Sequence, residues 1–265
     1  MTPLGRLVAG VITAMLLALV VLYLVAPILV GASVSVTGGE FLAFPPQGVS
    51  SRWYANILAD RQWRAAFVNS LVVGAMATAT ATVLGTLSAY GIALVQNRVL
   101  RRALVVLFVL PLAVPHMSLA MALYPVVAKL GLVGTRTGVA LAQALFTIPL
   151  VVLAVLPVLG RRDLQLERAA RTLGAGPVAS FRLVMLPIML PGIIVGAALS
   201  FMVSFDDVTA PIFLSGATAG TLPKKMLDAL ALNSDPSVMA ATTVIAGLGL
   251  GLFLFGVWVQ SRSSR

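Results

Sequence analysis

The 265-residue sequence contains no cysteine and only one histidine, His116. The absence of cysteine excludes disulfide bonds, a thiolate nucleophile and any metal site built on sulfur. A single histidine leaves too few ligands for a metal cluster. Charged residues are also scarce, at 10% of the chain, where soluble domains carry about 25%. These shortages argue against a soluble metalloprotein or redox protein.

Signatures of nucleotide binding and catalysis are missing as well. The motif of a phosphate-binding loop contains Gly-Lys followed by Ser or Thr, and none of the three lysines, Lys129, Lys224 and Lys225, follows a glycine. No G-x-S-x-G nucleophile elbow is present. The net charge of +10 would suit nucleic acid, but the basic residues lie between apolar runs and form no soluble basic domain. We therefore predict that the chain is not an enzyme, holds no cofactor of its own and binds no nucleic acid.

What the sequence has in abundance is apolar residues, at 60% of the chain with a mean hydropathy of +1.04. No soluble core hides so much apolar surface, so membrane lipid must be the surrounding solvent. A membrane-spanning helix needs about 20 mostly apolar residues, and backbone groups in lipid must be bonded within the segment. We predict an all-α membrane protein, a single transmembrane domain over residues 1–265. Its six predicted spans are 7–30, 67–95, 103–127, 138–159, 183–205 and 238–259.

The distribution of basic residues predicts the orientation of these spans. The two chain ends and the even-numbered connections carry more lysine and arginine than the other connections. Because basic residues concentrate on the cytoplasmic side, both termini are expected in the cytoplasm. Residues 31–66 and 206–237 then form extracytoplasmic loops, and residues 160–184 form a cytoplasmic loop. Within the third span, Pro111 and Pro115 are expected to loosen the helix and free carbonyls toward a cavity.

The cytoplasmic loop has the pattern of a short helix, a turn and a second helix. Glu167 and Arg171 stand four apart in the order that favours an ion pair, and Gly174 with Pro177 predicts the turn. The small apolar face suits a protein groove better than acyl chains, although a basic loop that only fixes orientation is the alternative. The apolar positions follow an i, i+3, i+4, i+7 spacing: Leu166, Ala169, Ala170 and Leu173.

This loop resembles the EAA loop of binding-protein-dependent ABC import permeases. The match rests on Ala169-Ala170, on Gly174 four residues later, and on Val184-x-Leu186-Pro187. One position departs from the pattern, because the family glutamate aligns with Arg168 and Glu167 lies one residue earlier. The resemblance implies a type I importer fold and a coupling helix that docks in a groove on an ATPase subunit. The implied coupling residues are Glu167, Arg168, Ala169, Ala170, Leu173, Gly174 and Ala175.

Other segments resemble the spermidine/putrescine importer branch of that family. They are FMVSFDDVTAPIFLSG at 201–216, Thr221-Leu222-Pro223, Asp235-Pro236 and LPLAVP at 110–115. The resemblance implies a multi-pass protein of the bacterial inner membrane. It also implies several partners: two ATPase subunits that bind ATP and Mg, a second and related permease, and an extracytoplasmic substrate-binding protein.

Three residues are candidates for the substrate pathway. Asp206 and Asp207 follow an apolar run, where adjacent carboxylates would attract an ammonium group; the alternative is that they mark the end of the span. His116 stands where the polyamine branch commonly has an acidic residue, which leaves an aminophosphonate, an amino acid derivative or another polar solute as alternatives to a polyamine. Two rival functions are an ion-driven secondary transporter, which needs carboxylates within its spans, and a membrane scaffold without a pathway.

Overall fold

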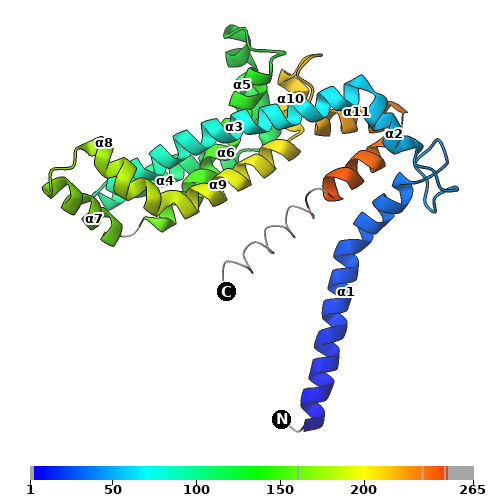
Figure 1. The fold of residues 1–265 in the computed structure, drawn as a ribbon, viewed down its shortest axis with the longest axis horizontal. Helices are drawn as coiled ribbons and strands as arrows, with labels where there is room; N and C mark the ends of the chain where they lie inside the picture. Colours follow the sequence, from blue (N-terminus) through cyan, green and yellow to red (C-terminus); the bar gives the residue numbers. More distant parts are fainter. Residues whose placement is uncertain (1–2, 160, 234–235, 248, 250–265) are drawn as a thin grey trace. The chain divides into compact units, whose positions relative to one another are not determined.

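The computed structural model describes residues 3–159, 161–233, 236–247 and 249, and this part of the chain holds helices and no strands (Figure 1). The predicted all-α class is therefore confirmed. The helices, in chain order, are α1 (Pro3–Ser35), α2 (Arg52–Ala59), α3 (Arg61–Leu94), α4 (Arg98–Val109), η1 (Leu110–Ala113), α5 (His116–Lys129), α6 (Arg136–Val155), η2 (Leu156–Val158), α7 (Arg161–Thr172), α8 (Pro177–Ser180), η3 (Phe181–Met185), α9 (Leu186–Asp206), α10 (Thr209–Leu214) and α11 (Leu222–Asn233).

Four of the described helical segments are long and apolar enough to cross a membrane. They are Gly10–Ser35, Arg61–Leu94, Arg136–Val158 and Pro177–Asp206, and a fifth is added if the bent pair of α4 and α5 counts as one span. These segments match the first five predicted runs. Of the sixth run, 238–259, the structure describes a shorter apolar helix, Ser237–Gly247, and the remaining positions from 250 lie outside the described residues.

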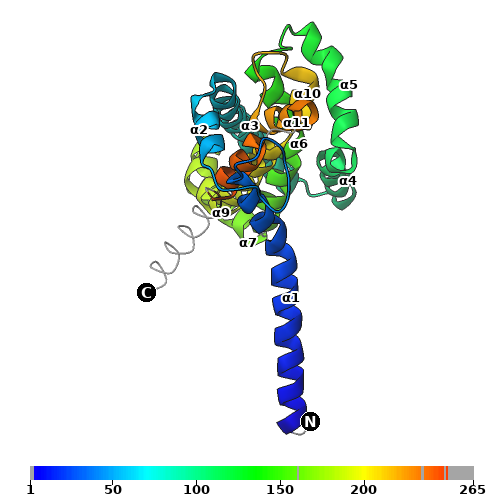
Figure 2. The ribbon, with the colours of Figure 1, turned by 90° about the vertical axis from the view of Figure 1, so that its right-hand side faces the viewer.

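The third predicted span, 103–127, is not one straight helix, and this expectation is corrected. α4 with η1 and α5 meet at an angle of 100°, which Figure 2 shows where the two helices join. Pro111 lies within the 3₁₀ turn η1, and Pro115 directly precedes α5. Neither proline has a backbone N–H, and the residue before a proline avoids the helical region. The two prolines were expected to loosen this helix, and in the structure they break it.

The two segments predicted as extracytoplasmic loops, 31–66 and 206–237, contain helices. α1 continues to Ser35, α2 lies within 31–66, and α10 and α11 lie within 206–237. In the first segment, Trp53 Nε1 donates a 2.9 Å hydrogen bond to the carbonyl of Thr37, and the hydroxyls of Tyr54 and Ser35 lie 2.7 Å apart. These bonds hold α2 against the residues that follow α1, so the aromatic pair Trp53-Tyr54 has a local packing role.

The chain divides into two compact units, residues 1–64 with 226–265, and residues 65–225. The predicted site residues all fall in the second unit. There α3, α6 and α9 run side by side (Figures 1 and 2). Glycines allow close approach: a Cβ on Gly85 of α3 would lie 2.6 Å from Val151 Cβ, and one on Gly192 of α9 would lie 2.7 Å from the Ala154 carbonyl oxygen. Small residues at such contacts are typical of helices packed within a membrane.

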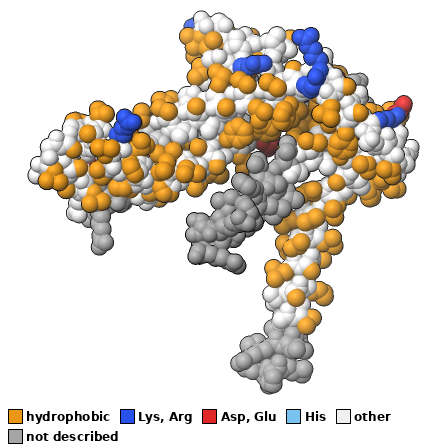
Figure 3. All heavy atoms as spheres, viewed as in Figure 1, with side chains coloured by type: hydrophobic (Ala, Val, Ile, Leu, Met, Phe, Trp, Pro, Cys, Tyr) orange, Lys and Arg blue, Asp and Glu red, His pale blue; other side chains and the backbone are white. Residues whose placement is uncertain are grey.

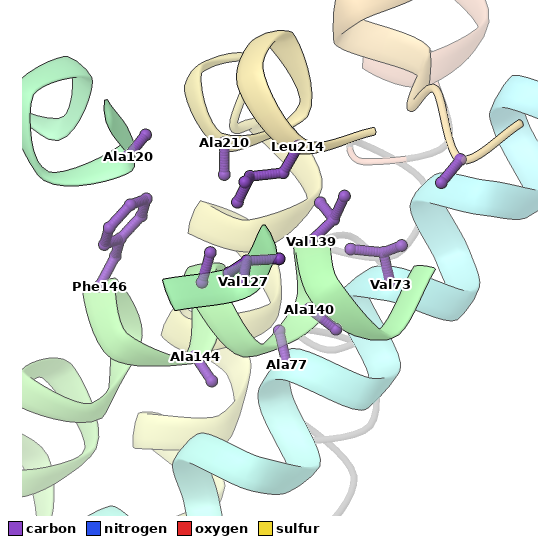
Figure 4. Close-up of a cluster of buried hydrophobic side chains, with 12 residues drawn as sticks. Val73, Ala77, Ala120, Val127, Val139, Ala140, Ala144, Phe146, Ala210 and Leu214 are labelled. Carbon is purple, nitrogen blue, oxygen red and sulfur yellow. The ribbon is translucent and has the colours of Figure 1, made fainter. Parts of the chain in front are cut away.

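The buried core of this unit consists mainly of small aliphatic side chains. In the cluster of Figure 4, α3, α5, α6 and α10 all contribute residues around Phe146 and Leu214. Hydrophobic side chains also lie over much of the visible surface (Figure 3). Among the large ones, Met15, Leu22 and Tyr23 of α1 are more than 60% exposed. This distribution places the large apolar residues where lipid can contact them.

Candidate functional site

The loop at residues 160–184, predicted to be cytoplasmic, forms the expected helix, turn and second helix, as α7, residues 173–176, and α8 continued by η3. The orientation of α7 reverses the usual arrangement of a surface helix. Leu166 is 54% exposed and Leu173 is 89% exposed, whereas Glu167 is only 3% exposed. Ala169 is exposed and Ala170 partly buried. A buried charged side chain beside exposed leucines is characteristic of a surface that binds another protein.

Glu167 is held by two side chains. Its Oε1 accepts a 2.6 Å hydrogen bond from Arg171 Nη2, which confirms the predicted i,i+4 ion pair. The same oxygen accepts a 2.5 Å hydrogen bond from the hydroxyl of Tyr90, near the end of α3. Buried charges are stable in proteins only when they are paired and bonded. Glu167 therefore attaches α7 to α3.

Tyr90 also contacts the segment that follows the turn. Its ring packs edge-on against Phe181, with ring centroids 5.1 Å apart. Phe181 begins η3, a π-helical stretch that leads without a break into α9. Ser180 Oγ adds a 3.4 Å bond to the carbonyl of Glu167. Tyr90 thus connects α3 both to α7 and to η3, the segment that leads into α9.

Gly174 ends α7 in a Schellman motif. The N–H of Ala175 bonds to the carbonyl of Ala170, and the N–H of Gly174 bonds to the carbonyl of Arg171, both at 3.0 Å. Gly174 has φ = +94°, a left-handed conformation that favours glycine. Nothing lies within 4 Å of the position that a Cβ would take. Backbone conformation, and not space, therefore requires glycine here.

A cavity of about 460 Å³ lies between α7 and the start of α4. The end of α3, at Ala93 and Leu94, and the following Val95 line it. Glutamines and Glu167 contribute further polar groups. Four arginines line it: Arg98, Arg101, Arg168 and Arg171. The site residue Arg168, which aligns with the family glutamate, thus belongs to a basic cavity.

The carboxylate of Asp207 is buried, at 8% exposure, and lies in a polar network. Its oxygens accept the N–H groups of Thr209 at 3.0 Å and Ala210 at 3.1 Å, and so cap the start of α10. Gln143 Nε2 of α6 donates a third bond at 3.0 Å, and Ser204 Oγ of α9 donates to Gln143 Oε1 at 2.5 Å. Asp207 therefore joins α6, α9 and α10.

Asp206 and His116, the other pathway candidates, lie in different surroundings. Asp206 is the exposed last residue of α9. His116 is half-buried at the start of α5, and its ring stacks on Phe146 with centroids 5.0 Å apart. Phe146 and Gln143 are three residues apart and so share one face of α6. The structure thus brings His116 and Asp207 to neighbouring positions along α6, while Asp206 points elsewhere.

Several residues that build this site did not emerge from the sequence patterns. Tyr90, Gln143 and Ser204 are polar groups within apolar runs, a signal that marks internal hydrogen bonds in membrane helices. Asn69 is a further case. It bonds to the carbonyls of Thr218 and Gly220 and accepts a 2.7 Å bond from Arg136 Nε, which ties α3 to the loop after α10.

Several known proteins have sequences similar to that of this chain. The family described as binding-protein-dependent transport system inner membrane component matches residues 81–265. The putrescine transport system permease protein PotI of Escherichia coli (strain K12) is 30% identical over 227 residues, which cover 82% of this chain and 80% of PotI. The spermidine/putrescine transport system permease protein PotC of Haemophilus influenzae is 26% identical over 83% of this chain and 85% of PotC.

Two further proteins are similar, one over a shorter part of the sequence and the other in fold. The trehalose transport system permease protein SugB of Mycobacterium tuberculosis is 29% identical over 66% of this chain and 63% of its own. A solved structure of a bacterial ABC transporter involved in the import of the acidic polysaccharide alginate matches with a TM-score of 0.70 and 17% identity, over 98% of both chains. The predicted resemblance is confirmed: the chain belongs to the family of inner membrane components of binding-protein-dependent transport systems.

Proposed function

We propose that this chain is the permease subunit of an ATP-driven importer and forms half of a translocation pathway for a small polar solute. The observation that carries this proposal is the exposed apolar face of α7, with Leu166, Ala169 and Leu173 turned outward while Glu167 is buried. Family membership says that such a chain works with other components, and α7 offers the surface on which a separate ATPase would bind.

Movement of α7 has a physical route to the spans. The bonds from Glu167 to Tyr90 reach α3, and the turn at Gly174 leads through η3 into α9. Displacement of α7 by ATPase closure would therefore act on two spans at once. In allosteric coupling, a ligand bound at one site shifts the equilibrium between two conformations at another site, here the spans. ATP and Mg would be bound by the ATPase and not by this chain.

The assembly that follows from this proposal has several components. Two ATPase subunits would bind on the cytoplasmic side, where both termini of this chain would also lie. A second, related permease would complete the pathway in the bacterial inner membrane. An extracytoplasmic binding protein would deliver the solute.

We propose a polyamine or related amine-containing compound as the solute. The support is the similarity to permeases named for putrescine and spermidine, together with the acidic pair at the end of α9. Asp206 is exposed and available to a cation, and Asp207 with His116 would form the polar part of the pathway wall against α6. Because Asp207 also caps α10, any substitution that removes its charge also removes the cap, so the two roles cannot be tested separately at this residue.

Reconstitution tests the proposal directly. The chain is assembled in vesicles with its ATPase, second permease and binding protein, and ATP hydrolysis and uptake are measured with and without putrescine. We expect solute-dependent stimulation of ATP hydrolysis and uptake that requires ATP. Uptake that survives ATP depletion and collapses with the ion gradient would identify a secondary transporter, and a lack of any uptake would favour a scaffold.

The same assay tests the acidic pair. Asp206→Asn removes an exposed carboxylate without disturbing the network of Asp207, so the putrescine concentration for half-maximal uptake should rise about two- to fivefold, as expected for loss of one surface charge. A neutral solute, if transported, should show no such change. An unaltered concentration dependence for putrescine would remove Asp206 from the pathway.

A further inference from the structure

We infer that the arginine-lined cavity between α4 and α7 binds the phosphate headgroup of an anionic phospholipid from the cytoplasmic leaflet. The four arginines there face one buried carboxylate, Glu167, which is already bonded to Arg171 and Tyr90. No bonded partner is found within the described residues for the guanidinium groups of Arg98, Arg101 and Arg168. The cavity therefore carries a local excess of positive charge with donors available to an anion.

The cavity lies on the opposite side of α7 from the proposed ATPase surface. Successive residues turn by about 100° around a helix, so Glu167, Arg168 and Arg171 share one face. Leu166, Ala169 and Leu173 share the opposite face. A protein docked on the leucine face would leave the arginine face uncovered, which argues for a ligand other than the ATPase.

An exposed apolar stripe on α3 leads to the cavity. Val83, Leu87 and Leu94 are 58%, 51% and 47% exposed, and their spacing puts them on one face with Gly91. Nothing lies within 4 Å of a Cβ at Gly91, so no neighbouring atom blocks the stripe there, and Leu94 at its end lines the cavity. An acyl chain along this stripe would place its headgroup among the arginines.

The size and expected location of the cavity fit the same ligand. Its volume of about 460 Å³ lies within the range of about 300–1,000 Å³ for small-ligand pockets. In the orientation predicted from the basic residues, the end of α3 reaches the cytoplasmic surface, where anionic lipids attract arginine clusters. Basic pockets between helices on that side are suited to phosphate headgroups.

Lipid retention by the purified full-length chain tests the inference without any need for transport. The chain is equilibrated in mixed micelles with equal amounts of phosphatidylglycerol and phosphatidylcholine, and bound lipid is counted by native mass spectrometry. We expect a preference for phosphatidylglycerol that falls about fivefold for each arginine removed in Arg98→Gln and Arg101→Gln. The matched control, Arg102→Gln, lies on the same helix outside the cavity and should retain the wild-type preference.

The remaining arms make each outcome decisive. The double variant Arg98→Lys/Arg101→Lys keeps both charges and should keep most of the preference for phosphatidylglycerol. It serves as the control if a glutamine variant misfolds. Soluble glycerophosphoglycerol should fail to displace the lipid; complete displacement would identify a site for free phosphodiesters and overturn the lipid assignment. Equal lipid retention by the Arg98→Gln/Arg101→Gln variant and the wild type would also overturn it. If that variant retained lipid normally but bound the ATPase more weakly, the arginines would instead bind acidic groups of the protein partner.

Discussion

At Gly174, in the proposed coupling loop, substitutions can distinguish the effect of backbone conformation from the effect of surface charge. Gly174 is required for its positive φ and has open space around its Cα. Asparagine tolerates the left-handed region better than most residues, so Gly174→Asn should insert and couple nearly as the wild type does. Gly174→Asp has almost the same shape but adds a charge beside the proposed docking surface.

We expect Gly174→Asp to lower uptake per ATP hydrolysed by about tenfold, because an unpaired carboxylate is costly to remove from water at an interface. The measurement compares ATP hydrolysis and uptake in the reconstituted complex for both variants. If the aspartate and asparagine variants couple equally well, the partner surface does not extend to this turn.

Tyr90 and Glu167 allow a second test at the same scale. Tyr90→Phe removes the hydroxyl that donates to the buried Glu167 carboxylate, and a hydrogen bond to a charged group stabilises by about 1.5–3 kcal/mol. The free energy of unfolding in detergent should fall by about that amount. Tyr124→Phe is the matched control, since Tyr124 is 45% exposed and no bond to its hydroxyl is found within the described residues. Equal effects of the two substitutions would show that the attachment of α7 to α3 contributes nothing.

At the scale of elements, the packing of α6 against α9 depends on two glycines. A Cβ on Gly192 would lie 2.7 Å from the Ala154 carbonyl oxygen, and one on Gly196 would lie 2.9 Å from the Val151 Cα. Because backbone atoms cannot move aside as a flexible side chain can, we expect Gly192→Ala to lower the free energy of unfolding by about 1–3 kcal/mol.

The control for this prediction is Gly91→Ala on α3. Gly91 is helical and has nothing within 4 Å of a Cβ, so alanine should stabilise the helix by up to about 1 kcal/mol. Thermal unfolding of the purified chain in detergent distinguishes the two. Destabilisation by both alanines, or by neither, would contradict the close contact of α6 and α9.

The elements also show where sequence patterns suffice. Apolar runs predict the long helices because lipid demands about 20 apolar residues whatever the tertiary structure. The short helices α2, α10 and α11 escape this criterion, since local capping and packing stabilise them; Asp207 at the start of α10 is the example. The break between η1 and α5 follows from prolines, but its 100° angle depends on packing that no local pattern encodes.

The candidate site divides in the same way. The i,i+4 pair of Glu167 and Arg171 and the turn at Gly174 are local features, so the sequence predicts both. The bond from Glu167 to Tyr90 joins residues 77 apart in sequence, and the cavity beside it forms only when α3, α4 and α7 meet. Such long-range contacts carry no local signature in one sequence.

For the whole molecule, the proposed coupling requires α7 to lie on the cytoplasmic side of the membrane and to contact the ATPase. The absence of native cysteine makes single-cysteine variants free of background labelling. Leu173, at 89% exposure, and Val49, at 87% exposure, are both accessible and are predicted to lie on opposite sides of the membrane.

The most direct test is a crosslink from Leu173→Cys in membranes that contain the assembled transporter. We expect an adduct with the ATPase whose yield changes with bound nucleotide. We also expect an impermeant thiol reagent added outside to label Val49→Cys and to leave Leu173→Cys unlabelled. Labelling of Leu173→Cys from outside, or the failure of any ATPase adduct to form in an active complex, would contradict the claim that α7 couples this chain to ATP hydrolysis.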